Sequence, residues 1–254
     1  MRHIFILMLV LVAGACKSTK DDPSSPANSV VTAPLNLHLH TYIGKEEVEE
    51  YNIVYHSEEG RAISLSMARV FLSDIELVKF DGSIYSIGDT VLLSEISEQV
   101  YHLGNVPVGN YKTIRFKAGL SPAVNAQIPA GTTGALNNKD MWFNSSAQAN
   151  NYIFMQFTGQ IDTSATLVNK MAPFTYKIGT NAQLKQIVMP NQNFSVQPNA
   201  TSYIHMLADY SVLFKGIDLK DINNLSVTSA QQNSLPYAVT VADNIVHLFQ
   251  YENE

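Results

Sequence analysis

The sequence predicts an all-β domain, folded as a sandwich or a barrel. Apolar and polar residues alternate along most of the chain, and Gly, Pro and Asn interrupt the alternation at short intervals. This pattern is typical of many short strands. The clearest alternation lies at residues 35–40, where three leucines alternate with Asn36, His38 and His40. We therefore expect a half-buried strand whose leucines face the core.

The remaining predicted strands follow along the chain. Residues 64–80 are rich in Val, Ile, Leu and Phe and stop at a turn signal, Asp81-Gly82. Residues 111–118 alternate again, with Ile114 and Phe116 on the apolar side. Shorter apolar segments lie at residues 91–96, 99–103, 152–159, 174–178, 186–189, 193–197, 203–214 and 238–241.

Two segments depart from the strand pattern. Residues 121–138 contain two prolines and two glycines, which predicts a long loop, and loops of that length usually carry function or cover something. Residues 242–251 predict one short C-terminal helix, because Ile245, Leu248 and Phe249 would share one face.

The N-terminus indicates a secretory signal peptide over residues 1–15. Arg2 and His3 precede an apolar run at residues 4–12, which is too short to span a bilayer core of roughly 30 Å. Small residues then lead to Cys16, the only cysteine of the chain. Its position resembles the bacterial lipobox, in which the cysteine is acylated, although Ala13 stands where that motif prefers leucine. An ordinary signal peptide with an incidental cysteine is the alternative.

Residues 16–33 are polar and rich in Ser and Pro, so we expect a flexible tether between the lipid and the domain. Lys20-Asp21-Asp22 resembles a signal that sends some Gram-negative lipoproteins to the outer face of the cell. We therefore expect a protein of the cell envelope, attached to the outer membrane by the lipid on Cys16 and either periplasmic or surface-exposed. With a single cysteine, the domain has no internal disulfide, and an acylated thiol has no chemistry of its own.

Composition favours one domain over residues 34–254. The chain of 254 residues is 46% hydrophobic and 15% charged, so it can bury a sizeable core, and no internal linker or repeat divides it. The formal net charge is −6 and no basic residues cluster. Nucleic acid is therefore not expected as a partner.

Enzyme motifs are absent from the sequence. It contains no Gly-x-Ser-x-Gly elbow, no Walker loop, no His-Glu-x-x-His and no Gly-x-Gly-x-x-Gly. We therefore expect that the protein is not an enzyme. A paired-carboxylate hydrolase remains an alternative, because Glu46, Glu47, Glu49 and Glu50 cluster in one stretch, although such a cluster is usually a solvated loop.

His38 and His40 are the residues most suggestive of chemistry. On a strand, residues i and i+2 point to the same face, with Cα atoms about 6.5 to 7 Å apart. Two imidazoles at that separation can converge on one ion, and imidazole suits copper and zinc. The alternative is that both histidines simply lie on the solvated face of the strand.

Five segments occur in an order that matches a known family. Residues 37–44 (Leu-His-Leu-His-Thr-Tyr-Ile-Gly) suit a first strand that runs into isoleucine-glycine. Residues 69–77 suit a strand ending in Ser-x-Ile-x-Leu, and residues 109–116 suit a Gly-x-Tyr-x-x-Ile-x-Phe strand. Residues 140–144 suit a Met-Trp segment, and residues 152–159 the strand after it. Together these segments resemble the MbnP-like copper-binding proteins from about residue 35 to the C-terminus.

The resemblance implies an immunoglobulin-like β-sandwich that binds a single copper ion. In relatives, histidines and a tryptophan oxidised to kynurenine form the site, and a di-haem peroxidase-like partner makes that oxidation. The matching positions here are His38, His40 and Trp142. Met141, a thioether beside Trp142, is a further candidate ligand. The chain departs from the family pattern because a single tryptophan directly follows Met141, and residues 145–151 separate it from the next strand.

The other histidines are interpreted as ordinary residues: His56 in a surface loop, His102 and His205 in strands, and His247 in the terminal helix. The leading hypothesis is a lipid-anchored, extracytoplasmic copper-binding protein for acquisition or storage. The alternative is a metal-free sandwich that binds a ligand or a protein in a cell-surface complex. The two hypotheses differ in whether the histidine pair faces the Met141-Trp142 segment.

Overall fold

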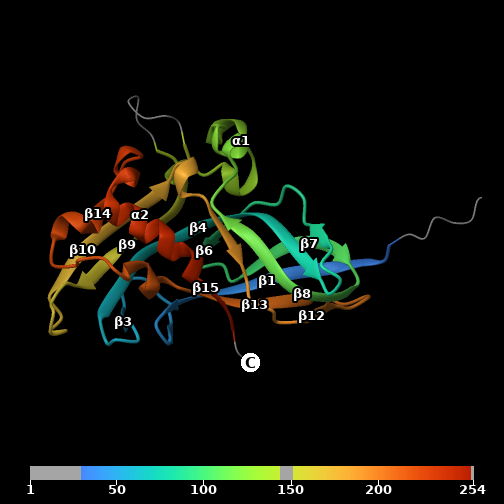
Figure 1. Ribbon diagram of the computed structural model, residues 1–254, viewed down its shortest axis with the longest axis horizontal. Helices are drawn as coiled ribbons and strands as arrows, with labels where there is room; N and C mark the ends of the chain where they lie inside the picture. The colour runs from blue at the N-terminus through green and yellow to red at the C-terminus, as the bar shows by residue number, and fades with distance from the viewer. Residues whose placement is uncertain (1–29, 144–150, 253–254) are drawn as a thin grey trace, which may run out of the picture. The chain divides into compact units, whose positions relative to one another are not determined.

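Two β-sheets build the domain, and residue alternation decides which side of each strand is buried. The computed structural model describes residues 30–143 and 151–252 (Figure 1). The smaller sheet has the strand order β15–β13–β1–β2, and β7 also pairs with β1. Its strands are β1 (Thr32–Ile43), β2 (Glu46–Glu47), β7 (Val100–Pro107), β13 (Ser202–Asp209) and β15 (Phe249–Tyr251).

The larger sheet has the strand order β11–β8–β4–β9–β10–β14. The long strand β4 also pairs with three short strands: β3 at residues 62–64, β6 at residues 69–72 and β5 at residues 76–78. β12 pairs with β8. The strands are β3 (Val54–His56), β4 (Ala62–Lys79), β5 (Ile84–Ser86), β6 (Leu92–Glu95), β8 (Gly109–Ala118), β9 (Ile153–Asp162), β10 (Met171–Gly179), β11 (Lys185–Val188), β12 (Phe194–Val196) and β14 (Ser226–Val227).

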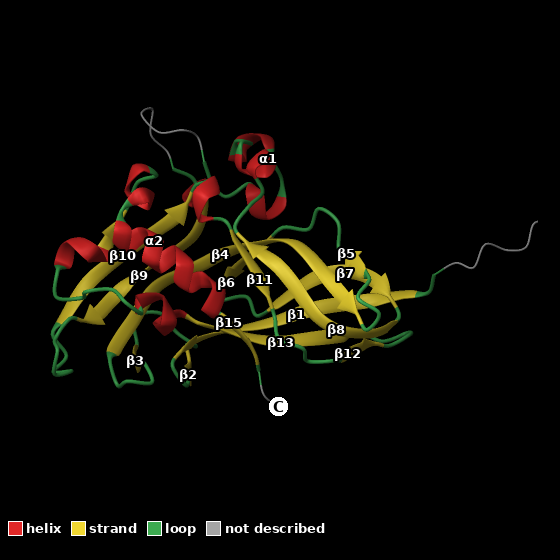
Figure 2. Cartoon of the chain, in the orientation of Figure 1, coloured by secondary structure: helices red, strands yellow, loops and turns green. Residues whose placement is uncertain are grey.

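Helices are short and lie outside the sheets (Figure 2). The two α-helices are α1 (Pro122–Asn125) and α2 (Pro236–Asn244). Single 3-10 turns occupy Pro129–Gly131, Gly134–Leu136, Lys139–Met141, Asn181–Gln183, Tyr210–Phe214, Ile222–Leu225, Gln231–Ser234 and Ile245–His247. Among residues 30–143 and 151–252, no helix has the length and apolar character needed to cross a membrane.

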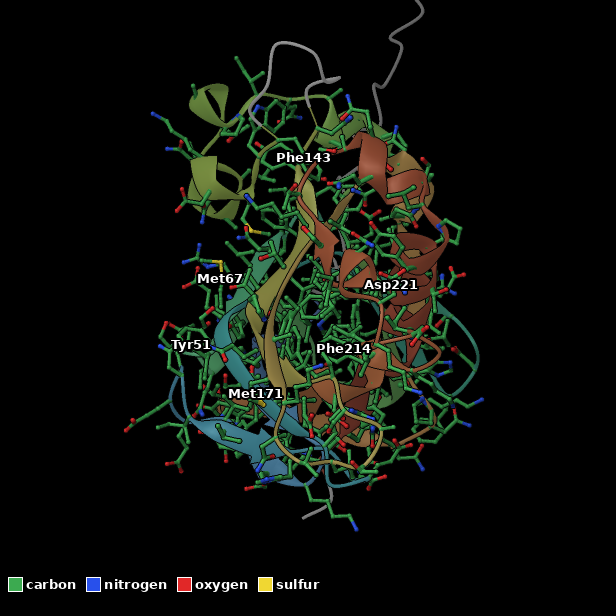
Figure 3. All side chains as sticks on the ribbon, turned by 90° about the vertical axis from the view of Figure 1, so that its left-hand side faces the viewer. Tyr51, Met67, Phe143, Met171, Phe214 and Asp221 are labelled. Atoms are coloured by element: carbon green, nitrogen blue, oxygen red, sulfur yellow. The ribbon has the colours of Figure 1, made fainter. Side chains whose placement is uncertain are left out.

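The main hydrophobic core fills the space between the two sheets. Leu35, Leu37 and Leu39 of β1 are at most 5% exposed and belong to this core, as their alternation predicts. From the larger sheet, Phe157 packs its ring against those of Phe174, Tyr176, Tyr210 and Phe214. Figure 3 labels Phe214 among the side chains that fill the interior.

A second apolar cluster covers the outer face of the larger sheet. Phe71 of β4 and Phe154 of β9 belong to this cluster, whereas their chain neighbours Val70 and Met155 belong to the main core. Because neighbouring residues of a strand point to opposite faces, the two clusters lie on opposite sides of the sheet. The predicted loop at residues 121–138 is observed, and it contributes side chains that pack on this cluster. The loop therefore covers the outer face, as its length suggested.

The predicted all-β sandwich is confirmed, with three local differences. The predicted strand at residues 238–241 is wrong, because these residues lie in α2, which starts at Pro236; proline at the first helical position has a backbone angle suited to a helix start. The predicted helix over residues 242–251 is displaced toward the N-terminus, and its last residues form β15 on the edge of β13. β1 begins at Thr32, within the segment predicted as tether, and already pairs with β7 there. The predicted signal peptide, Cys16 and most of the tether lie outside the described residues.

Candidate metal site

The outward face of β1 carries the predicted histidine pair. The three leucines of β1 face the core, so His38 and His40 point away from it. β1 pairs with β13 in parallel, and the register sets His38 directly beside His205. In Figure 1 these two strands run side by side although their histidines are 167 residues apart in the chain. Strand pairing therefore brings a third histidine to the pair.

The three imidazoles form a continuous chain of contacts. His38 Nδ1 lies 3.1 Å from Nδ1 of His205. His38 Nε2 lies 2.9 Å from Nε2 of His40. The ring of His38 stands nearly perpendicular to both of its neighbours, at 80° to His40 and 78° to His205. Both ring nitrogens of His38 thus face another imidazole nitrogen.

Two carboxylates lie at the His40 end of this chain. Glu47 Oε1 is 2.9 Å from His40 Nδ1, and Glu252 Oε1 is 3.7 Å from the same atom. Despite these short distances, His40 Nδ1 is buried and has no hydrogen-bond partner in line with it. The hydroxyl of Tyr42 donates to Glu252 at 3.4 Å, and the amide of Gln99 donates to Glu47 at 3.0 Å. Negative charge is therefore held beside a nitrogen that lacks an aligned partner.

The turn between β1 and β2 positions Glu47. Tyr42 pairs with Glu47 and Ile43 with Glu46, so Glu47 projects from the same face as His40 and Tyr42. Gly44 makes the turn with a positive φ of 62°, and a Cβ at this position would lie 2.7 Å from the backbone oxygen of His56. Only glycine avoids that overlap. The Gly44 N–H donates to Asp209 at the end of β13, which ties the turn to the strand that carries His205.

Burial keeps His38 neutral. Its partial burial lowers the pKa of His38 below the ordinary 6.5, and the neighbouring His40 and His205 lower this pKa further. Glu252 and Glu47 act in the opposite direction on the pKa without reversing the shift. The neutral imidazole is the form that binds a metal. His38 is thus available as a ligand at neutral pH.

The donor set fits a transition-metal ion. Two nitrogens bound to one ion at ~2.0–2.1 Å lie ~2.9 Å apart at a right angle and ~3.3 Å apart at a tetrahedral angle. The Nε2 atoms of His38 and His40 lie 2.9 Å apart in a mutual hydrogen bond, so both can reach one ion once that bond is broken. Within the described residues, the side chains as they stand form no group of three or more donors on one point. Binding therefore requires small ring rotations, which the broad terminal torsion of histidine permits.

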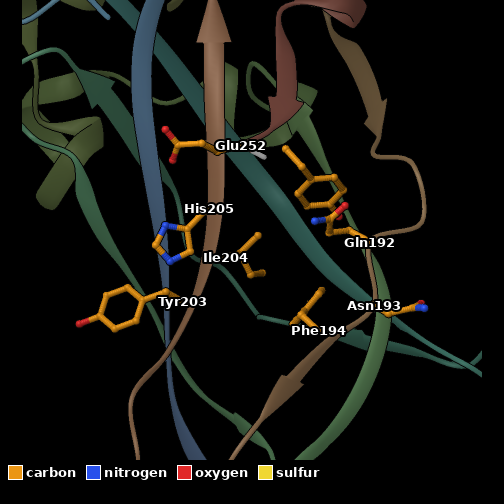
Figure 4. Close-up of a pocket in the computed structure, with 8 residues that line it drawn as sticks. Gln192, Asn193, Phe194, Tyr203, Ile204, His205 and Glu252 are labelled. Atoms are coloured by element: carbon orange, nitrogen blue, oxygen red, sulfur yellow. The ribbon is translucent and has the colours of Figure 1, made fainter. Parts of the chain in front are cut away.

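A cavity adjoins the cluster on the β13 side. It has a volume of about 400 Å³. Figure 4 shows Tyr203 and His205 on one side of β13 and Ile204 on the other, as strand alternation requires. The cavity is lined by residues of β13 and of the segments next to this strand: Gln192, Asn193, Phe194, Tyr203, Ile204, His205, Tyr251 and Glu252. His205 and Glu252 are therefore among the residues at the edge of this cavity.

Met141 and Trp142 lie in a different part of the fold. Met141 is fully buried in the second apolar cluster, and Trp142 packs against that cluster with its ring 4.8 Å from the ring of Tyr152. The histidines lie on the outer face of the smaller sheet, whereas this cluster lies on the outer face of the larger one. Two packed sheets are ~10 Å apart. The structure therefore brings together His38 and His40 but does not bring Met141 or Trp142 to them.

Three further histidines of residues 30–143 and 151–252 lie apart from the contact chain. His102 Nδ1 hydrogen-bonds to Asn36 Oδ1 at 3.0 Å on the same face. His56 lies 3.5 Å from Glu46 on the exposed side of the β1–β2 turn, and His247 is exposed in the 3-10 turn after α2. Sequence interpretation missed His205 and Glu252. The only signal for His205 was its alternation with Ile204 and Met206, which places it on the polar face of its strand but does not identify its neighbour.

Comparisons with known proteins agree with this fold. A scan against protein families matches MbnP over residues 32–231. Among solved structures, MbnP from Methylosinus trichosporium is similar, with a TM-score of 0.52 and 16% sequence identity; the match covers 74% of this chain and 80% of that one. At 16% sequence identity, this structural similarity supports a shared fold only. No curated protein matches the chain. Because the family match spans most of its length, the chain belongs to the MbnP family.

Proposed function

We propose that this protein is a lipid-anchored, extracytoplasmic copper-binding protein that holds copper for acquisition or storage. The observation that carries the proposal is the contact chain of three histidines, with its 2.9 Å approach between His38 Nε2 and His40 Nε2. His38 and His40 are the proposed ligands. The metal-free alternative would use the same face and the cavity beside His205 to bind a ligand or a protein.

The donor type of the pair suits copper. Imidazole nitrogen is a ligand for both copper and zinc. Copper(II) binds nitrogen donors more tightly than zinc does. Met141 is not among the proposed ligands, because it is buried in the second cluster.

The proposed mechanism is capture without turnover. β1 pairs with β13 on one side and β7 on the other, so the sheet fixes the backbone of both proposed ligands and only their rings rotate on binding. A preorganised pair loses little entropy when an ion binds. Bound copper would supply a positive charge near Glu47 and Glu252, which offset it electrostatically.

Trp142 is predicted to be dispensable for copper affinity. Because it packs on the outer face of the opposite sheet, replacing Trp142 by Phe should leave copper affinity within ~2-fold of wild type, consistent with additivity of distant sites. Chelator competition on the full-length chain measures this. A loss above ~10-fold would contradict the separation of the two regions.

Oxidation of Trp142 by a di-haem peroxidase-like partner remains a prediction from the family resemblance, and intact mass after co-expression with such a partner tests it.

The membrane anchor is tested separately. Replacing Cys16 by Ser removes the thiol that acylation requires, so the protein should move from the membrane fraction to the soluble fraction of the cell envelope. Fractionation followed by immunoblotting measures the shift. Metabolic labelling with a palmitate analogue should mark the wild type and not the variant. A wild-type protein that is soluble and unlabelled would refute the lipoprotein assignment.

A further inference from the structure

We propose that Glu47 and His205 are positioning residues: Glu47 holds His40 in the tautomer that binds copper through Nε2, and His205 accepts the Nδ1 proton that His38 carries once its own Nε2 binds the ion. The inference rests on the proposed function, because it assigns roles within the same cluster. It follows from one continuous series of contacts: Glu47 to His40, His40 to His38, and His38 to His205. In this series the two Nδ1 atoms of the ligands face protein partners, and the two Nε2 atoms face each other.

Glu47 fixes the tautomer of His40. A carboxylate can only accept hydrogen bonds, and its oxygen lies 2.9 Å from His40 Nδ1. A bare Nδ1 there would set its lone pair against the negative carboxylate, so Nδ1 carries the ring proton and Nε2 keeps its lone pair, although the proton and the oxygen are not aligned as a hydrogen bond. Gln99 donates to the same carboxylate oxygen and thereby holds it in place. A carboxylate on the distal nitrogen is the usual partner of a metal-binding histidine, and it raises the basicity of the ligating nitrogen.

His205 has the corresponding role for His38. The parallel register places its Nδ1 3.1 Å from Nδ1 of His38. When His38 Nε2 binds an ion, its ring proton lies on Nδ1, and His205 Nδ1 is within reach to accept it. Both proposed ligands are then held at Nδ1, one by a carboxylate and one by an imidazole.

Copper binding shifts protons within the rings without changing their number. In the metal-free chain, His40 Nε2 is bare, so His38 Nε2 carries a proton and donates it, while His205 Nδ1 donates to His38 Nδ1. On binding, the His38 proton moves from Nε2 to Nδ1, and the His205 proton moves from Nδ1 to Nε2. The two Nε2 lone pairs of His38 and His40 are then free for the ion.

Copper(II) affinity of the full-length chain in detergent tests both roles, with a chelator as competitor. Glu47→Ala and His205→Ala should each weaken binding ~10–100-fold, the usual effect of losing such a partner. Glu47→Gln and His205→Asn should recover most of that loss, because an amide oxygen still accepts the Nδ1 proton. Glu46→Ala is the matched control, since this neighbour accepts from the His56 backbone and should bind copper like wild type. Thermal unfolding verifies that each variant is folded.

Long-range ¹H–¹⁵N correlation of the metal-free chain gives a readout that a merely structural role would not change. His40 should be protonated at Nδ1 in the wild type and in Glu47→Gln, and should populate both tautomers in Glu47→Ala. Unchanged affinity and tautomer in Glu47→Ala would overturn the inference. So would a loss as complete as that of His38→Ala, because Glu47 would then be a ligand. A wild type that binds no copper contradicts the proposed function instead, since the tautomers are measured without metal.

Discussion

Replacing His38 by alanine should reduce copper binding of the full-length chain to the level of non-specific association. His38 occupies the centre of the cluster, and both of its ring nitrogens face another imidazole. The substitution removes one proposed ligand and also separates His40 from His205. We expect a loss above ~100-fold, beyond the range usual for an outer-sphere partner. Chelator competition with copper(II) measures the affinity.

His102→Ala provides the matched control for this prediction. His102 lies on the same face of the smaller sheet and bonds to Asn36 rather than to the cluster. The His102→Ala variant should bind copper with the affinity of the wild type. Equal losses in the His38 and His102 variants would mean that copper adsorbs to surface histidines without a defined site.

Replacing Phe157 by alanine should lower the free energy of unfolding by ~3–5 kcal/mol, the range typical of removing a buried aromatic ring. Phe157 is fully buried in β9. Its ring lies 4.9 Å from Tyr176 of β10 and 5.7 Å from Phe214 of the segment after β13. The ring therefore joins the larger sheet to the chain that leaves the smaller one. Urea denaturation followed by tryptophan fluorescence measures the change.

Phe80→Ala is the corresponding control for the core. Phe80 follows β4 and is 58% exposed, so its replacement should change stability by less than ~0.5 kcal/mol, as surface substitutions usually do. If the two phenylalanine variants were equally stable, Phe157 would not be part of a packed core.

Local sequence patterns predicted the part of the site that lies on one strand. The alternation of leucines with His38 and His40 requires only that residues 35–40 be extended with one face buried. The strand, its inward leucines and its outward histidine pair therefore follow from the sequence alone. The same reasoning predicted the long loop at residues 121–138, because its prolines and glycines interrupt strands and long helices; the structure has only α1 and short 3-10 turns there.

Site residues that come from distant parts of the chain could not be predicted from local patterns. His205 joins the pair only because β13 aligns in parallel with β1, and Glu252 approaches only because the chain end forms β15 on β13. Alternation identifies the face of a strand but not its neighbour. The placement of Trp142 also depends on distant parts of the chain. The family resemblance predicted it near the histidines, whereas alternation in β4 and β9 sets its cluster on the outer face of the other sheet.

Copper stoichiometry of the full-length chain tests whether this face of the smaller sheet holds copper. The purified protein is loaded with copper(II), freed of loosely bound metal by a weak chelator, and analysed for metal and protein together. The proposed function predicts one copper ion per chain, which is lost when His38 is replaced. Copper-free wild-type protein after this treatment would contradict it and favour a metal-free binding role.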